Sequence, residues 1–333
     1  MNQPFIAHST RCGMGTVITH DIVGPNANKA LKDAHKETHR LERLLSRFIA
    51  SSDISRINRG AGISRVRIHP ETVDVLVIAK RVSQIAPQKF DVTIGPLVDL
   101  WRSAKKISQR PSDSEINATL DLITSNDLTF DSRKRTAFLS RNSQSIDLGG
   151  IAKGYAADRV CDKMRKRGIT SAYTDFGGNI ATIGGKPDGS PWRVGIQHPR
   201  RENALIGVIE IKNQSVVTSG DYQQFFMGLD NKRYHHILDP QTGVPAASGL
   251  ISVTIVSPSS VEADALSTAI FVAGKAKAVQ YLREYPQAKA ILIDNDLNIT
   301  ISNGLEHSFH LCEDHDIYSL VYQKGLDSSE SEN

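Results

Sequence analysis

The stretch that decides the fold is Val261-Glu262-Ala263-Asp264-Ala265-Leu266-Ser267-Thr268-Ala269. Its apolar residues, continued by Ile270, recur at three- and four-residue steps, and this spacing predicts a helix. The preceding segment Ser257-Pro258-Ser259-Ser260 supplies hydroxyl groups that can cap the start of that helix.

On such a helix Asp264 and Thr268 are four residues apart, so their oxygen atoms share one face, and Ser267 lies beside them. One carboxylate with one or two hydroxyls is an oxygen-only cluster, which suits a hard cation such as Mg²⁺. The stretch contains neither Cys nor His, which argues against zinc. The alternative is an ordinary capped helix whose hydroxyls bond back to its own carbonyls.

The composition limits the classes of protein to consider. The chain has 333 residues, of which 39% are hydrophobic and 23% are charged, as is typical of a globular protein. Its net charge of +4 is small and dispersed, so no nucleic-acid partner is expected. The three cysteines, Cys12, Cys161 and Cys312, are odd in number and far apart in the sequence, so neither a disulfide framework nor a metal knuckle is suggested. Cys12 is either a reactive thiol or a small buried residue.

The sequence also bears on location. No apolar run is long enough to span a bilayer, so no integral membrane segment is expected. Residues 1–4 lack the charged and apolar regions of a signal peptide. We expect a cytoplasmic protein as the sequence is written, and a periplasmic or membrane-anchored one if a leader was removed.

Hydrophobic periodicity and turn residues predict alternating helices and strands without an internal repeat or a long linker. Residues 54–58 are predicted as a short turn, and 89–101 as a loop that leads into a helical turn. The acidic, Ser-rich tail 325–333 is predicted to be disordered. Helices are predicted at 25–47, 70–85, 112–123, 150–167, from 260 and at 275–285. Pro70 suits the first turn of the second of these helices, and Ser112 with Glu115 predicts a capping box for the third. Strands are predicted as a pair within 5–23 and at 128–130, 136–139, 172–175, 192–197, 206–211, 216–218, 250–255 and 290–293.

Two glycine-containing turns are candidate ligand sites. Asp147-Leu148-Gly149-Gly150 stands at a predicted helix start, where free amides and the positive end of the helix dipole favour an anion. The Gly150 carbonyl could reach a metal there. Asp175-Phe176-Gly177-Gly178-Asn179 ends a strand with two glycines that let a ligand approach the backbone. The alternative for each is a tight structural turn.

The segment His235-His236-Ile237-Leu238-Asp239-Pro240 places two histidines before an Asp-Pro turn. Adjacent side chains on a strand point to opposite sides, so we expect at most one of the two to be catalytic. Imidazole titrates near neutrality and would serve as a general base.

Taken together these segments resemble the ordered motifs of the ApbE family, the FAD:protein FMN transferases. The match runs over roughly residues 10 to 310 in the expected order, and eight motifs in sequence are far more specific than one. The motifs are Met14-Gly15-Thr16, Phe90 to Leu97, Asp147 to Tyr155, Asp175 to Asn179, Trp192 to Ile196, Thr218 to Tyr222, His236 to Gly243 and Glu262 to Ala269.

The resemblance implies one α+β domain over 5–320, a mixed α/β catalytic domain with a largely antiparallel sheet and packed helices. It implies Mg²⁺-dependent transfer of FMN from FAD to a Ser or Thr of an acceptor flavoprotein, with release of AMP. His236 matches a family histidine implicated in transfer. The implied metal group is the Gly150 carbonyl, Asp264, Ser267 and Thr268. Some relatives have a second carboxylate at Ser267.

The resemblance further implies a set of flavin-nucleotide contacts. Phe48 stands where relatives often have Tyr, so ring stacking survives there without the hydroxyl's hydrogen bond. The implied contacts are Met14, Phe48, Lys89, Phe90, Asp91, Asp147, Lys153 and Leu238.

Two alternative functions stay open. Some relatives hydrolyse FAD to FMN and AMP, and the same metal and base would serve that reaction. A carrier that binds flavin without turnover belongs to another class, and the joint presence of Asp264, Thr268 and His236 weighs against it. The sequence does not identify the acceptor protein, the oligomeric state or the divalent metal.

Overall fold

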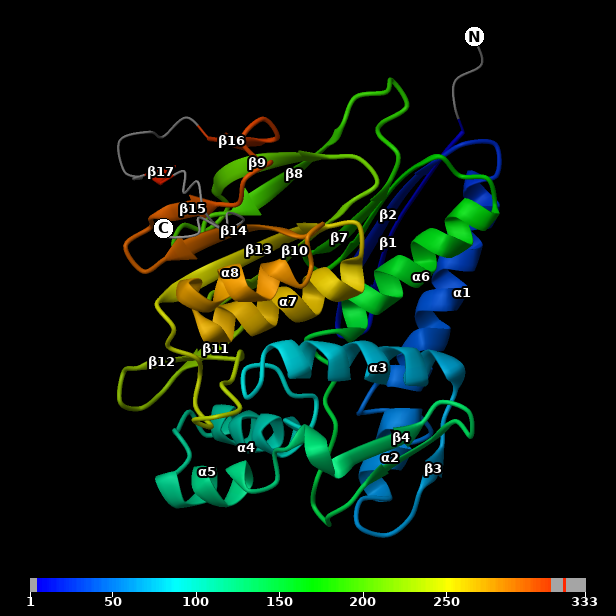
Figure 1. The fold of residues 1–333 in the computed structure, drawn as a ribbon. Helices are drawn as coiled ribbons and strands as arrows, with labels where there is room; N and C mark the ends of the chain where they lie inside the picture. Colours follow the sequence, from blue (N-terminus) through cyan, green and yellow to red (C-terminus); the bar gives the residue numbers. More distant parts are fainter. Residues whose placement is uncertain (1–4, 313–319, 322–333) are drawn as a thin grey trace, which may run out of the picture. The chain divides into compact units, whose positions relative to one another are not determined.

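The computed structural model describes residues 5–312 and 320–321, and their contacts divide them into two compact units (Figure 1). The first unit contains the described residues of 1–40, 153–220 and 249–333, and the second contains 41–152 and 221–248. The single domain predicted over 5–320 stays a prediction.

A nine-stranded sheet is the centre of the first unit, in the order β1-β2-β6-β7-β10-β13-β14-β15-β17. Neighbouring strands are antiparallel except for the parallel pair β15 and β17. The strands are β1 Ile6–Gly13, β2 Thr16–Val23, β6 Ser171–Phe176, β7 Asn179–Ile183, β10 Ser215–Gly220, β13 Leu250–Ser257, β14 Lys289–Asp294, β15 Ile299–Ile301 and β17 Leu320–Val321. A smaller antiparallel sheet has the order β16-β9-β8, with β8 Trp192–Gln197, β9 Leu205–Ile211 and β16 Phe309–Leu311.

The helices of this unit are α6 Ala152–Lys166, α7 Ser260–Ala273 and α8 Lys275–Arg283, together with the first part of α1 Ala27–Leu45. Helix α7 packs against β10 and β13, with α8 beside it (Figure 1). Apolar side chains of β8 and β9 join those of β10 and β13 in one core cluster. Strand β13 is buried at every position because both of its faces are covered, which explains its nearly continuous apolar sequence.

The second unit combines short helices with two small sheets. Its core cluster includes Leu97, Trp101, Ile116, Tyr234 and Leu238. Strands β3 Val66–Arg67, β5 Thr136–Leu139 and β4 Leu128–Asp131 form one sheet, and β11 Phe225–Met227 and β12 Arg233–His235 form a two-stranded ribbon. The helices are α2 Asp53–Arg59, α3 Pro70–Ile85, α4 Gly95–Lys106 and α5 Asp113–Leu120, with a 3-10 turn, η1, at Ser125–Asp127.

The predicted fold class, mixed α/β with a largely antiparallel sheet, is confirmed. Helix α3 has the predicted bounds, and Ser112 with Glu115 forms the predicted capping box of α5. Strands β3, β7, β11, β12, β15, β16 and β17 were not predicted. The predicted turn at 54–58 is helix α2, and the segment 89–101, predicted as a loop leading into a helical turn, contains the start of the longer helix α4. The predicted disordered tail lies outside the described residues. Within the described part of the chain, no helix is both long and apolar enough to cross a membrane.

Candidate functional site

Asp264 is buried on α7, and α6 determines where its carboxylate lies. The backbone N–H of Gly154 on α6 donates to Oδ2 of Asp264 over 2.9 Å. A Cβ at Gly154 would be 2.3 Å from the Ser260 carbonyl oxygen and 2.7 Å from Cβ of Asp264. The two helices can therefore approach this closely only with glycine at position 154.

The hydroxyls predicted to join Asp264 lie one turn further along α7. Ser267 Oγ donates to the Asp264 carbonyl oxygen over 2.9 Å, and Thr268 Oγ1 donates to the same oxygen over 3.3 Å. This is the back-bonding that the sequence left open as an alternative. Ser219 Oγ on β10 lies 2.9 Å from Ser267 Oγ and 3.3 Å from Thr268 Oγ1. Ser219 belongs to a motif noted in the sequence, but no role was predicted for it.

A second residue of α6, Asp158, holds the start of α7. Its Oδ1 accepts from the backbone N–H of Ser260 over 2.9 Å, and its Oδ2 accepts from that of Val261 over 3.0 Å. The first N–H groups of a helix have no partner within the helix, so this carboxylate acts as a cap from another element. Burial raises the pKa of Asp158 to about 6, although these hydrogen bonds favour the ionised form. The sequence did not reveal this cap because it joins residues about a hundred positions apart.

Two turns that the resemblance includes lie next to each other in the first unit. Met14 and Gly15, with φ of 51° and 73°, form the tight connection between β1 and β2. A Cβ at Gly177 would be only 1.9 Å from Thr16 Oγ1, so the second turn touches the first. A positive φ at Met14 is a strained conformation for a residue with a side chain, as is often found at binding sites.

Phe48 is the exposed aromatic residue of the second unit's candidate site. Its side chain is 67% exposed, although a ring of this size is usually buried. The Arg102 guanidinium lies 4.6 Å from the centre of the Phe48 ring, and that of Arg47 lies 5.8 Å from it. An exposed ring held in place by its neighbours offers a stacking surface to a planar ligand.

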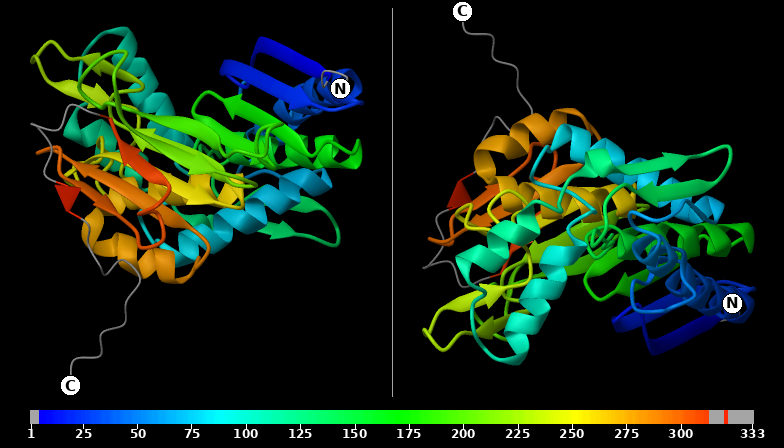
Figure 2. Two further views of the ribbon diagram at one scale, coloured as in Figure 1. Left: turned by 90° about the horizontal axis from the view of Figure 1, so that it is seen from above. Right: turned by 90° about the horizontal axis from the view of Figure 1, so that it is seen from below.

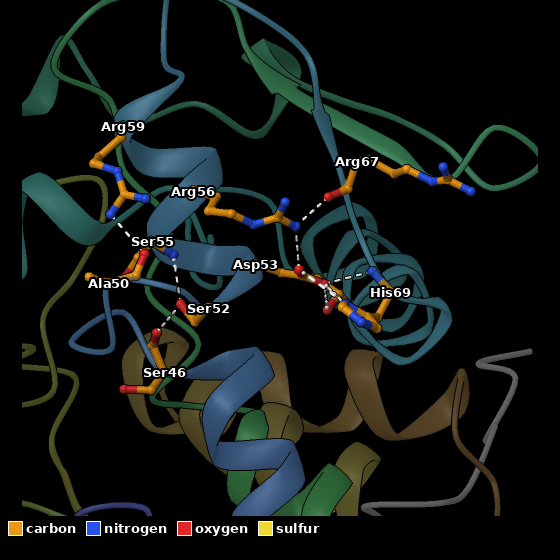
Figure 3. Close-up of polar contacts among 10 residues, drawn as sticks. Ser46, Ala50, Ser52, Asp53, Ser55, Arg56, Arg59, Arg67 and His69 are labelled. Atoms are coloured by element: carbon orange, nitrogen blue, oxygen red, sulfur yellow. Dashed lines mark hydrogen bonds and ion pairs between the residues drawn. The ribbon is translucent and has the colours of Figure 1, made fainter.

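Helix α2 fixes the loop that carries Phe48 (Figure 3). Ser52 Oγ donates to the Ser46 carbonyl over 2.5 Å, and Nη1 of Arg59 donates to the Ala50 carbonyl over 2.8 Å. Ser55 Oγ donates to the Arg47 carbonyl over 2.8 Å. Without these hydrogen bonds, the same carbonyl oxygens would have to accept from water.

Helix α2 is in turn fixed to the start of α3 through Asp53, which is fully buried (Figure 3). Asp53 accepts from the backbone N–H of His69 over 2.6 Å, from Thr72 Oγ1 over 2.7 Å and from Arg56 Nη2 over 2.6 Å. Burial alone would raise the pKa of Asp53, but these hydrogen bonds together outweigh it and lower the pKa. The loop that carries Phe48 is therefore fixed by α2, which is itself bonded to the start of α3.

Arg47 connects three segments that the sequence shows only separately. Its Nη1 donates to Asp147 Oδ2 over 2.9 Å and to the Gly95 carbonyl over 3.2 Å, and its Nη2 pairs with Asp99. Asp147 Oδ1 accepts from the Gly149 N–H over 2.7 Å. Both carboxylate oxygens of Asp147, a predicted flavin contact, therefore accept hydrogen bonds within the protein. Sequence reasoning missed Arg47, and no local pattern marks it.

Of the predicted flavin contacts Lys89, Phe90 and Asp91, the first is bonded to the segment after His236, and the other two line a pocket together with Pro240 and Gln241 of that segment. Lys89 Nζ pairs with Asp239 Oδ2 over 2.9 Å. Phe90 is buried, and so is Leu238, the residue before Asp239. Burial raises the pKa of Asp91, whose two oxygens accept from the backbone N–H groups of Thr93 and Ser125.

His235 and His236 have different hydrogen bonds, as expected of adjacent residues. His235 ends β12; its Nε2 donates to the Ala246 carbonyl over 3.0 Å and its Nδ1 accepts from the Ile237 N–H. His236 follows the strand at an exposed bend, and its Nδ1 lies 3.1 Å from the Gln224 carbonyl. A carbonyl oxygen can only accept, so Nδ1 carries the proton. In the neutral imidazole the lone pair is therefore on Nε2.

The predicted site residues fall in both units. The first unit holds Met14, Lys153, Asp264, Ser267 and Thr268, and the second holds Phe48, Lys89, Phe90, Asp91, Asp147, Gly150, His236 and Leu238. Their roles in binding and catalysis stay predictions.

The donors gathered around Asp264 fit a hard cation, because they are a carboxylate and hydroxyls. No group of three or more His, Cys, Asp or Glu side chains that could hold a metal occurs among the described residues. A cation here would need further oxygen ligands, such as those of a phosphate.

This arrangement defines a mixed α/β protein with an oxygen-rich cluster in one unit and an exposed aromatic and histidine in the other. A family model described as "ApbE family" matches residues 14–292. The chain belongs to the ApbE family.

Relatives and solved structures agree with this assignment. The FAD:protein FMN transferase of Klebsiella pneumoniae is 36% identical over 79% of this chain and 82% of its own length. That of Escherichia coli K12 is 32% identical over 84% of each. The ApbE protein of Thermotoga maritima has a TM-score of 0.82 at 31% identity, covering 90% of this chain and 97% of its own. The flavin transferase ApbE of Vibrio cholerae has the same TM-score at 27% identity, covering 92% of this chain and all of its own.

Proposed function

We propose that this chain is an FAD:protein FMN transferase, which moves FMN from FAD to a Ser or Thr hydroxyl of a target flavoprotein. The names of its relatives support flavin transfer. Transfer to a Ser or Thr hydroxyl requires a general base, and the hydrogen bond from His236 to Gln224 supports this role for His236. It leaves an exposed imidazole with its lone pair on Nε2.

The proposed reaction is a substitution at phosphorus. The acceptor's hydroxyl oxygen bonds to the phosphorus of the FMN half of FAD, and the bond from that phosphorus to the bridging oxygen breaks. AMP leaves with the bridging oxygen, and FMN stays on the acceptor through a phosphoester bond. The hydroxyl proton passes to Nε2 of His236, which makes the oxygen a better nucleophile.

The remaining residues position the reactants. Phe48 offers a ring face for the flavin, and the ion pair with Arg47 fixes the Asp147 carboxylate in the second unit. In the first unit, Asp264 with Ser267 and Thr268 would hold Mg²⁺. Bound Mg²⁺ neutralises charge that develops on pyrophosphate oxygens.

Incubation with FAD, Mg²⁺ and a candidate acceptor flavoprotein domain tests the proposal. Mass spectrometry should show one FMN added to a Ser or Thr of the acceptor, with AMP released in equal amount. Release of FMN and AMP without labelling would indicate FAD pyrophosphatase activity instead. Tight FAD binding without either product would indicate a flavin carrier.

A further inference from the structure

The β11–β12 ribbon of the second unit has one covered face and one uncovered face. Phe226 and Tyr234 stack on each other at 5.3 Å, and Tyr234 also lies 5.3 Å from the Trp101 ring on α4. The ribbon lies beside α4 in each view of Figures 1 and 2. Because side chains alternate along a strand, Phe225 and Met227 must lie on the other face of the ribbon, and both are exposed.

Two further exposed apolar side chains lie in segments close to the ribbon. Leu229 follows β11 and is 78% exposed, and Ile107 follows α4 and is 65% exposed. The Leu229 N–H donates to the Ser108 carbonyl over 2.8 Å, so the two segments are in contact. Arg233 on β12 stacks on the Phe225 ring, with its guanidinium 4.0 Å from the ring centre. Phe, Met and Arg are enriched at protein–protein interfaces, and clustered exposed apolar side chains mark interaction sites.

The ribbon is joined directly to the candidate general base. Gln224 precedes β11 and His236 follows β12. The Gln224 carbonyl accepts from the backbone N–H of His236 over 3.0 Å and bonds its Nδ1. A molecule that covers the ribbon therefore lies next to His236. In the proposed reaction, the molecule that must bring a hydroxyl to His236 is the acceptor protein.

The charges of these segments favour an acidic partner. Five cationic side chains, Lys105, Lys106, Arg110, Lys232 and Arg233, stand against three carboxylates, Asp113, Asp221 and Asp230. Both arginines already have a carboxylate partner, since Arg110 pairs with Asp113 over 2.6 Å and Arg233 lies 4.0 Å from Asp221, and Asp230 accepts from Tyr234 Oη over 2.7 Å. The excess positive charge would attract a negatively charged surface.

We propose that Phe225, Met227, Leu229 and Ile107, with the surrounding cations, form the docking surface for the acceptor flavoprotein, which contacts it through an acidic and apolar patch beside its Ser or Thr. This inference rests on the proposed function, because it assumes a protein acceptor.

The test uses the acceptor domain that the wild-type protein labels, and compares Met227→Ser/Leu229→Ser with wild type. We expect the KM for the acceptor to rise tenfold or more, while the Kd for FAD and the rate of FAD hydrolysis in the absence of acceptor stay unchanged. Lys105→Glu/Lys106→Glu should raise the same KM and weaken its dependence on salt. Ile63→Ser is the matched control, because Ile63 belongs to the same unit and is 76% exposed.

Other outcomes would overturn the docking surface. An unchanged acceptor KM in both double variants would show that the acceptor does not bind this surface, while leaving the proposed function intact. A wild-type dimer that the Met227→Ser/Leu229→Ser change dissociates, seen by analytical ultracentrifugation, would assign the surface to a second copy. Binding of the wild type to anionic vesicles, lost in the same variant with the acceptor KM unchanged, would assign it to a lipid surface. If the wild type labels no acceptor at all, the proposed function and the docking surface both fail.

Discussion

Gly154 on α6 donates its backbone N–H to Oδ2 of Asp264 on α7 over 2.9 Å, and four residues later Asp158 on α6 accepts from the first N–H groups of α7. Helix α6 therefore holds α7 at two points, its start and its buried carboxylate. The position of the proposed metal ligand depends on this pair of contacts as much as on α7 itself.

Gly154→Ala should disturb that contact without removing any functional group. The new methyl would meet the backbone of Ser260, which cannot turn aside as a flexible side chain can. We expect a loss of about 1–3 kcal/mol in the free energy of unfolding and a higher Mg²⁺ concentration for half-maximal transfer. Chemical denaturation and an Mg²⁺ titration measure the two effects. Lys166→Ala near the end of the same helix is the control, and equal behaviour of the two variants would contradict the positioning role.

Asp264→Asn tests the metal ligand with little change in volume. The amide keeps an oxygen but loses the negative charge, so Mg²⁺-dependent transfer should fall by about a hundredfold or more while the fold is retained. Glu262→Gln, the same chemical change on the same helix, should keep wild-type activity. Circular dichroism and transfer rates across an Mg²⁺ titration decide this. Wild-type activity in Asp264→Asn would show that the metal is held elsewhere.

The Asp158 cap should make stability depend on pH. Burial raises the pKa of Asp158 to about 6 in the folded protein, above the usual aspartate value, so the folded state binds this proton more tightly than the unfolded chain. Between about pH 4 and 6, stability should therefore fall as the pH rises, by up to about 1.4 kcal/mol per pH unit from this group. The difference in unfolding free energy between wild type and Asp158→Asn, measured over that range, isolates the effect. A difference that does not change with pH would show that Asp158 keeps an ordinary pKa.

Phe48→Ala should weaken FAD binding. Removing a stacked ring costs about 0.5–1.5 kcal/mol beyond its buried area, so we expect roughly a tenfold higher Kd. Phe48→Tyr should bind FAD at least as well as wild type. The control is Phe5→Ala, because Phe5 is 68% exposed and belongs to the other unit. Fluorescence titration with FAD measures the Kd of all three variants. An unchanged Kd in Phe48→Ala would show that the Phe48 ring does not contact FAD.

Local sequence patterns predicted the elements whose causes are local. Proline at the start of α3 and the Ser112–Glu115 capping box mark their helices within one turn, and both predictions are confirmed. Strand β7 was missed because the glycine pair at Gly177 and Gly178 indicated a turn but not the strand after it. The ribbon strands were missed because each has only three residues, too few to show a period.

The same limit applies to the candidate site, where only features with local causes could be predicted from the sequence. Helical spacing placed Asp264 and Thr268 together, and the motifs indicated the glycine turns. The contacts that orient these groups join distant residues, such as Arg47 with Asp147 and Asp158 with Ser260, and only the fold brings them together. Spacing also could not show that Ser267 and Thr268 bond back to the Asp264 carbonyl, since that depends on the side-chain rotamers.

The two adjacent histidines offer a matched pair of variants that separates catalysis from stability. His236→Ala removes the exposed imidazole whose lone pair is on Nε2, so transfer should fall about a hundredfold or more while the Kd for FAD changes little. His235→Ala removes a ring with both nitrogens bonded to the backbone of Ala246 and Ile237. It should lower the free energy of unfolding by about 1–3 kcal/mol and leave the specific activity of the folded fraction unchanged.

The pH profile of the wild type gives an independent check on His236. An imidazolium has no lone pair to accept the hydroxyl proton, so transfer should decline on acidification, and this decline should be absent from the residual activity of His236→Ala. FMN transfer, FAD binding and denaturation are measured on both alanine variants. If His236→Ala transferred FMN at the wild-type rate, or if His235→Ala alone lost transfer while folded, the general base would have to be another group.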